Sequence, residues 1–370
     1  MIPKLKVNSC DVSTKELVLG FDHVQLYVGN AYQAARYFET DFGFEPLERA
    51  GLDTGSADTV SYLLGNGNVR IIVTSATRAC PVADYVHKHG DSVTDVAFAV
   101  EDVDVVYERA VKNGAKAVME PAALKLGTHE IRKAIVGTPG ELVHSLVQSS
   151  DSRAVGLPNG RKLDRAYDGR TGGFEKIDHT ALAVGQGELD SWVAFYESAF
   201  GFQVRHEEIT STGMTAMRSK VVENSSRTVK FPIVEPAPSR KASQVEEFVQ
   251  FHKGAGVQHL AVLCDDICQT VQMLRTRGVQ FLNVPDTYYD MLSDRIGEVG
   301  DQLKQLRESR VLLDRDEWGD LLQTFSTPVT GRPTLFFELI QRNGGRGFGS
   351  GNIRALFEAV EREQAARAGW

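Results

Sequence analysis

The chain carries one sequence pattern twice, and the two copies lie roughly 155 residues apart. Residues 21–29 read FDHVQLYVG and residues 177–185 read IDHTALAVG, and each copy runs into a helix-like segment that ends in Phe-Gly-Phe. Later segments correspond in the same order: residues 90–100 match 254–264, and residues 140–148 match 333–341. In a chain of 370 residues, a duplication of this size predicts two domains with separate cores.

Only the second copy has a complete set of metal-binding side chains at the matched positions. Where the first half has His23, Asp95 and Ser145, the second has His179, His259 and Glu338. Two histidines and one carboxylate on three separate strands are the ligands of non-haem Fe(II) sites that keep open coordination positions. The sequence therefore predicts an iron site in the second half and none in the first.

Each of these residues also has a purely structural interpretation. The Asp-His pair occurs in both halves, so a packing or strand-capping role would explain it without a metal, and we prefer that role for His23. Glu338 could face water on an edge strand, but it lies in the apolar segment PTLFFELI, where a buried carboxylate is costly unless it is paired or binds a metal. The shared register of all three favours the metal site. We expect the remaining histidines to be surface or core residues: His87, His89, His129, His144, His206 and His252.

Composition and charge exclude several classes of partner. The chain has 42% hydrophobic and 24% charged residues and a net charge of −8, with no basic stripe for nucleic acid and no polybasic block for a membrane surface. It has no run of 18 apolar residues and no signal-like N-terminus, so we expect a cytoplasmic protein. The spacing of its cysteines suits reduced thiols: Cys10, Cys80, Cys264 and Cys268.

Periodicity predicts an α+β fold with two modules in each half. Each module has an alternating strand, a helix and further strands, so four modules form curled mixed sheets around cavities, with helices outside. We expect a first domain without metal at 1–150, a polar, Gly-containing linker at 151–174 and a catalytic domain at 175–370. The second half adds an insertion at 287–319 and a closing helix within 347–369, which we interpret as a lid.

The segments IDH, GAGVQHLA, TLFFELIQRNG and GFGSGN together resemble the family of 4-hydroxyphenylpyruvate dioxygenases and 4-hydroxymandelate synthases, within the vicinal oxygen chelate superfamily. The resemblance covers essentially the whole chain. It implies two tandem domains of that superfamily, Fe(II) bound by His179, His259 and Glu338, and an aryl 2-oxo acid substrate oxidised with O2 and loss of CO2. It also implies self-association. Finally, it assigns substrate-cavity positions to Ser219, Val234, Gln244, Gln258, Gln323, Phe325, Phe336, Phe348, Asn352 and Ile353.

Two of these positions bear on the product. Homogentisate-forming members of the family read PINEP and GNF, whereas this chain reads PIVEP and GNI, with Val234 and Ile353 at the changed positions. Both changes resemble the mandelate synthases and favour 4-hydroxymandelate, although Pro232 is kept as in the dioxygenases. The alternative is homogentisate formation in tyrosine catabolism. The same fold also serves non-catalytic binding proteins, isomerases and lyases, but a simple binder needs neither the complete triad nor the closing helix.

Overall fold

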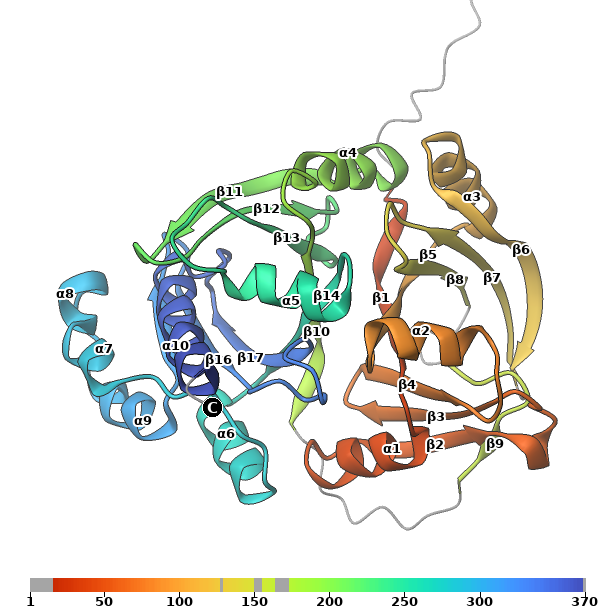
Figure 1. Ribbon diagram of the computed structural model, residues 1–370, viewed down its shortest axis with the longest axis horizontal. Helices are drawn as coiled ribbons and strands as arrows, with labels where there is room; N and C mark the ends of the chain where they lie inside the picture. Colours follow the sequence, from red (N-terminus) through yellow and green to blue (C-terminus); the bar gives the residue numbers. More distant parts are fainter. Residues whose placement is uncertain (1–15, 127–128, 150–154, 164–172, 369–370) are drawn as a thin grey trace, which may run out of the picture.

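The protein is described here from a computed structural model that covers residues 16–126, 129–149, 155–163 and 173–368. These residues form two mixed β-sheets, each curled into an open barrel, with helices mostly outside the curve (Figure 1). The α+β prediction is therefore confirmed. Cys80, Cys264 and Cys268 are free thiols, as expected, and Cys10 lies outside the described residues.

Four modules follow one order of strand, helix and three strands. The first half contains β1 (Val18–Tyr27), α1 (Ala31–Thr40), β2 (Glu45–Ala50), β3 (Thr59–Asn66) and β4 (Val69–Ala76), then β5 (Ser92–Val100), α3 (Val103–Lys112), β6 (Lys116–Leu126), β7 (His129–Gly137) and β8 (Val143–Gln148). The second half contains β10 (Phe174–Ala183), α4 (Leu189–Phe200), β11 (Gln203–Ser211), β12 (Ala216–Glu223) and β13 (Lys230–Pro236), then β14 (Gly256–Cys264), α6 (Ile267–Thr276), β15 (Leu312–Arg315), β16 (Asp320–Phe325) and β17 (Phe336–Asn343).

Shorter elements connect the modules. These are η1 (Leu52–Thr54), α2 (Pro81–His89), β9 (Arg161–Lys162), α5 (Gln244–His252), α7 (Asp286–Asp290), α8 (Leu292–Ile296), α9 (Gln302–Ser309) and the closing helix α10 (Ser350–Ala368). Strand β9 lies inside the expected linker and pairs with the edge strand β2 of the first sheet. The expected domain boundaries stay a prediction. Helix α10 lies within the curve of the second sheet, whereas α4 and α6 lie outside it (Figure 1).

Local sequence explains how the outer helices form and pack. The Asn30 side chain caps α1 by accepting a hydrogen bond from the Gln33 N–H, which satisfies a free donor in the first turn. Ala31, Ala35 and Phe38 are the buried residues of α1, and their spacing places them on one face of the helix. That face packs on the sheet and leaves the polar face to solvent.

The two sheets share one pairing register. Strand β1 pairs antiparallel with β5 so that Gln25 faces Asp95, and β10 pairs with β14 so that Ala181 faces His259. In both halves, the first residue of the pair lies two positions after the histidine of the Asp-His motif, His23 or His179. The second residue is the next position matched between the halves, Asp95 or His259. The alignment of the two halves deduced from the sequence is confirmed, because strand register is fixed by which side chains face the interior.

The interface between the halves contains an aromatic cluster and buried polar contacts. Phe98 of the first half contacts Phe231 of the second, with ring centroids 5.9 Å apart. His144 Nε2 lies 3.0 Å from the Tyr196 hydroxyl, and burial lowers the pKa of His144 to about 4, so this histidine is neutral at physiological pH. His144 is thus a core residue, as expected.

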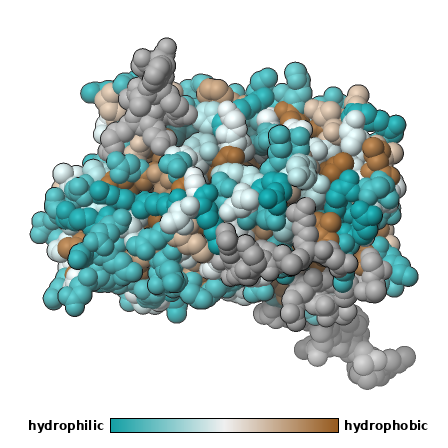
Figure 2. All heavy atoms as spheres, turned by 90° about the horizontal axis from the view of Figure 1, so that it is seen from below, coloured by the Kyte–Doolittle hydropathy of each residue, from teal (hydrophilic) through white to brown (hydrophobic). Residues whose placement is uncertain are grey.

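The outer surface contrasts with this core. On the face shown in Figure 2, hydrophilic side chains predominate and hydrophobic ones are scattered among them. Scattered exposed apolar residues are ordinary on a protein surface. Among the described helices, none is long and apolar enough to cross a membrane.

Candidate metal centre and substrate cavity

Three strands of the second sheet bring the expected ligands together. His179 lies on β10, His259 on β14 and Glu338 on β17, and one ligand atom from each lies within 4.8 Å of the other two. Glu338 Oε2 is 3.2 Å from His179 Nε2 and 3.4 Å from His259 Nε2. Within the described part of the chain, this is the one such group of three with metal-ligand geometry. The triad predicted from the sequence is therefore assembled at a single point.

The charge state of Glu338 suits metal binding. Burial alone would raise the pKa of this carboxyl, but the two neighbouring histidines outweigh burial and lower the pKa to about 2. Glu338 is therefore ionised at physiological pH and is ready to act as an anionic ligand.

The neighbouring residue Asp178 orients His179. The His179 Nδ1–H donates to Asp178 Oδ2 at 2.9 Å, which leaves Nε2 facing Glu338. Asp178 also accepts two hydrogen bonds of 2.8 Å from Arg342 and one of 3.0 Å from Lys230. Although burial raises the pKa of Asp178, these two cations hold it well below its usual range. A carboxylate behind a ligating histidine fixes its tautomer and ring orientation.

His259 is held differently. Its ring stacks on Phe336 with centroids 4.9 Å apart and an angle of 29° between the planes. Its Nδ1 is buried and has no partner among the described residues. Phe336 therefore helps to position a ligand ring.

A chain of hydrogen bonds connects the triad to the closing helix. Gln323 Nε2 donates to Glu338 Oε1 at 2.8 Å, and Asn352 Nδ2 of α10 donates to Gln323 Oε1 at 2.8 Å. The Tyr288 hydroxyl, from the insertion, donates to Asn352 Oδ1 at 2.8 Å. The amide of Gln323 is thus engaged by a metal ligand and by α10.

A cavity of about 60 Å³ opens beside the triad. Eight residues expected from the sequence line it: Ser219, Val234, Gln244, Gln258, Gln323, Phe325, Phe348 and Ile353. The other two expected residues, Phe336 and Asn352, lie directly behind this wall: Phe336 stacks on His259, and Asn352 donates to Gln323. Their expected role in substrate binding stays a prediction. The cavity walls are mostly apolar with a few amide and hydroxyl groups, which is typical of a small-molecule site.

Sequence reasoning missed several residues of this site. The cavity is also lined by His206, Met217, Val221, Pro232 and Leu356. His206, expected to be a surface or core residue, lies in the cavity wall and pairs with Glu208 at 3.2 Å. Glu208 in turn accepts a hydrogen bond of 2.7 Å from Ser350 at the start of α10. The alternating pattern of β11 places His206 on the inner face, and that pattern was the available signal.

The matched positions of the first half form no comparable triad. The Asp95 carboxylate accepts hydrogen bonds from the backbone N–H and from the hydroxyl of Ser145. Both carboxylate oxygens are therefore occupied within the protein. Asp95 and Ser145 therefore bind each other at the positions where the second half has His259 and Glu338.

Comparison with known proteins identifies the family. Residues 22–131 and 176–301 each match the Glyoxalase/Bleomycin resistance protein/Dioxygenase superfamily. The 4-hydroxyphenylpyruvate dioxygenase of Neurospora crassa is 41% identical over 99% of this chain and 95% of its own length. That of Yarrowia lipolytica is 38% identical over 94% of this chain and 93% of its own length. The chain belongs to the 4-hydroxyphenylpyruvate dioxygenase family.

A solved structure agrees with this membership. A mutant of 4-hydroxymandelate synthase from Streptomyces coelicolor superposes with a TM-score of 0.87 and 41% identity, covering 94% of this chain and 99% of that one. As a member of the 4-hydroxyphenylpyruvate dioxygenase family, the chain is an enzyme of the dioxygenase class with a buried His-His-Glu group that could bind a metal.

The role of Asp178 can be tested by Asp178→Asn. Asparagine can still accept the His179 hydrogen bond but lacks the charge, so we expect metal affinity to fall about 10–100-fold. Isothermal titration of the metal-free protein with Fe(II) under anaerobic conditions measures this change. Asp301→Asn, on the exposed surface, is the matched control. Unchanged Fe(II) affinity in a folded Asp178→Asn protein would show that the hydrogen bonds of Asp178 only support the fold.

Proposed function

We propose that this enzyme is an Fe(II)-dependent, decarboxylating dioxygenase that converts 4-hydroxyphenylpyruvate and O2 into 4-hydroxymandelate and CO2. Residues 175–370 would form its catalytic domain. The proposal rests on the His-His-Glu group, on the small cavity beside it and on the aliphatic residues that line this cavity.

The residues present fit Fe(II). Two imidazole nitrogens and one ionised carboxylate are the donor set of open non-haem iron sites, and His179, His259 and Glu338 would hold the ion. When bound, the ion supplies open positions for chelation of a 2-oxo acid and for activation of dioxygen. Asp178 and Phe336 would keep the two imidazole rings in place during turnover.

The chain's other cavity residues would bind and shield the substrate. Ser219, Gln244 and Gln258 offer hydroxyl and amide groups for the polar ends of the substrate. Phe325 and Phe348 lie in the same wall and would pack against its aromatic ring. Helix α10, anchored through Gln323, would exclude water from the reacting atoms.

The observation that favours hydroxymandelate is the pair of aliphatic residues in one cavity. Val234, 6% exposed, and the partly buried Ile353 both line it and belong to one hydrophobic cluster. At these two positions the wall offers neither an amide to anchor the ring nor an aromatic surface to stack on it. The ring can then sit with its benzylic CH2, instead of its C1 carbon, nearest the oxidising centre.

Homogentisate formation is the second candidate. It is favoured by Pro232, which lines the cavity and is shared with the dioxygenases, and by the curated relatives, whose names are those of 4-hydroxyphenylpyruvate dioxygenases. Incubation of the purified Fe(II)-loaded protein with 4-hydroxyphenylpyruvate, followed by chromatography, separates the two products. A main product of 4-hydroxymandelate supports the proposal, and a main product of homogentisate supports the alternative. Without oxygen uptake, both fail.

The lid function of α10 can be tested with Asn352→Ala. Asn352 is fully buried and joins α10 to Gln323, Tyr288 and Arg295, so its truncation removes three hydrogen bonds that hold the lid. At about 0.5–1.5 kcal/mol each, their loss should enlarge the open population at least roughly tenfold. We expect more oxygen consumed per product formed, measured with an oxygen electrode and chromatography. Arg354→Ala, on the exposed face of α10, should keep the normal ratio. A normal ratio in Asn352→Ala would mean that the helix only packs.

A further inference from the structure

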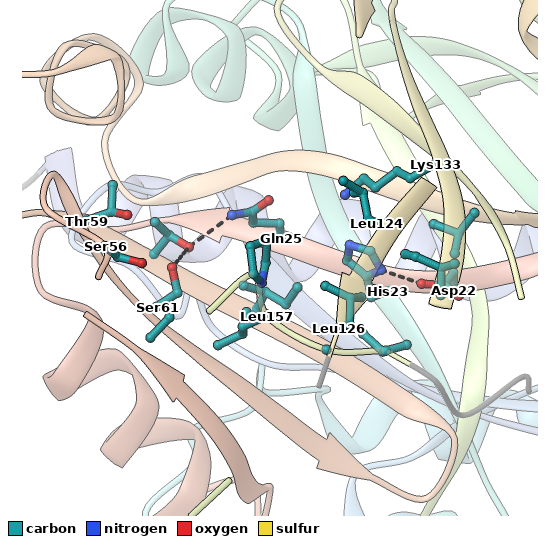
Figure 3. A pocket seen from close by; sticks show the side chains of 18 of the residues that line it. Asp22, His23, Gln25, Ser56, Thr59, Ser61, Leu124, Leu126, Lys133 and Leu157 are labelled. Atoms are coloured by element: carbon teal, nitrogen blue, oxygen red, sulfur yellow. Dashed lines mark hydrogen bonds and ion pairs between the residues drawn. The ribbon is translucent and has the colours of Figure 1, made fainter. Parts of the chain in front are cut away.

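The first half contains its own cavity, larger than the one beside the triad. Its volume is about 270 Å³, close to the lower end of the range for small-molecule sites, which begins at about 300 Å³. Its lining includes the buried His23 and the partly exposed Lys133, Ser56 and Thr59. Figure 3 shows Lys133 and His23 toward one end of the drawn side chains and Thr59 toward the other. The proposed reaction uses none of these residues.

The strand register shows that this cavity reuses positions of the proposed substrate site. Ser61 pairs with Thr74 across β3 and β4, as Ser219 pairs with Val234 across β12 and β13. Thr74 pairs with Tyr27, four positions after His23. Val234 pairs with Ala183, four positions after His179. Ser61 therefore corresponds to Ser219, and Thr74 to Val234. Where the second half has a valine, the first half offers a hydroxyl.

Lys133 corresponds in the same way to Gln323. Lys133 pairs with Val147, which lies two residues after Ser145. Gln323 pairs with Ile340, which lies two residues after Glu338, the residue matched to Ser145. The Lys133 side chain has no ion pair or hydrogen bond with the described residues, although it lines the cavity. The first half thus has no metal-ligand triad at the matched positions, and among the described residues its cavity contains a cation without a charged partner.

His23 provides a second group that lacks a partner. Its Nδ1–H is directed to the Asp22 carboxylate, whereas its buried Nε2 has no hydrogen-bond partner. The side chain is 6% exposed, and Figure 3 shows the ring turned so that this nitrogen lies away from Asp22. A buried polar atom without a partner is costly unless a ligand or a water satisfies it.

The opposite end of the cavity is polar and uncharged, and the middle is apolar. Gln25 donates to the Thr74 hydroxyl at 3.0 Å, and the Ser61 and Thr74 hydroxyls lie 2.8 Å apart. Leu126 and Leu157 line the cavity and are drawn between the two ends in Figure 3. A ligand that matches these walls has an anionic end, an apolar body and a hydrogen-bonding group opposite the charge.

We propose that the first half holds a second, metal-free binding site for a small hydroxylated aromatic monocarboxylic acid. Lys133 binds the carboxylate, and the Ser61, Thr74 and Gln25 group binds the hydroxyl. The Lys133 ammonium lines the cavity and supplies a positive charge that a carboxylate can pair with.

Calorimetric titration of the full-length protein with 4-hydroxyphenylacetate tests this site. Lys133→Met keeps the length of the side chain and removes the charge, so we expect one binding equivalent to vanish or to weaken about tenfold or more. Lys125→Met, an exposed lysine on the neighbouring strand β6, should titrate like the wild type. Turnover of 4-hydroxyphenylpyruvate should be unchanged in both variants, which verifies their folding and their catalytic site. An identical titration for wild type and Lys133→Met, or no binding by the wild type, overturns the proposal.

A second variant tests the hydroxyl end independently. Thr74→Val preserves shape and removes the hydroxyl, so it should weaken 4-hydroxyphenylacetate several-fold but leave phenylacetate, which has no hydroxyl, unaffected at the same equivalent. The neutral analogue 4-hydroxyphenylethanol should not occupy the site. Equal effects of Thr74→Val on the two acids would contradict the assigned orientation of the ligand. Tight binding of the alcohol would contradict the requirement for a carboxylate.

Discussion

Replacing Glu338 with alanine should stop turnover and reduce Fe(II) affinity by more than the roughly 10–100-fold typical of losing an outer partner of a metal ligand. Glu338 is the one carboxylate in the group of three, and both histidine Nε2 atoms lie within 3.4 Å of its Oε2. Without it the site keeps two neutral nitrogen ligands and no negative charge to balance the ion. Iron content after desalting and oxygen uptake with 4-hydroxyphenylpyruvate measure the two effects.

The first half offers a matched control for this variant. Ser145 occupies the position that corresponds to Glu338, so Ser145→Ala should leave iron content and turnover at wild-type values. It removes one hydrogen bond to Asp95, whereas the backbone N–H of residue 145 still donates to that carboxylate. Near-normal activity of Glu338→Ala without added carboxylate, with circular dichroism showing a folded protein, would contradict the assignment of the metal site.

The fold and the triad were accessible from the sequence because both are written into the repeat. A duplicated strand and helix order implies a duplicated sheet, and matched strand register then carries His179 and His259 to the same face. Glu338 stands out because its neighbours on β17 are apolar and buried. Local pattern was sufficient for these residues.

The partners of the triad were not accessible in the same way. Arg342 and Lys230 converge on Asp178 from strands β17 and β13, and nothing in the local sequence indicates that two cations share one buried carboxylate. The positions of Phe336 and Asn352 depend on neighbours in space, His259 and Gln323. Such contacts are set by tertiary packing, which residue spacing along one strand or helix does not encode.

The double change Val234→Asn with Ile353→Phe should shift the product from 4-hydroxymandelate toward homogentisate. Val234 lies on β13 and Ile353 on α10, yet both line one cavity and belong to one hydrophobic cluster. Asparagine would add an amide anchor for the ring, and phenylalanine would add an aromatic surface on the lid helix α10. Together they should turn the ring so that its C1 carbon, instead of the benzylic CH2, meets the oxidising centre.

The size of this shift follows from competition between two transition states. A difference of about 1.4 kcal/mol changes a product ratio tenfold, so a partial rotation of the ring is measurable by chromatography. Because the two side chains line the same cavity, we expect the double variant to change the ratio more than the combined effects of the single variants. Additive single effects would show that each residue acts alone on the substrate. An unchanged ratio in a folded, active double variant would mean that Val234 and Ile353 do not set the position of the ring, and that product choice depends on other residues of the cavity.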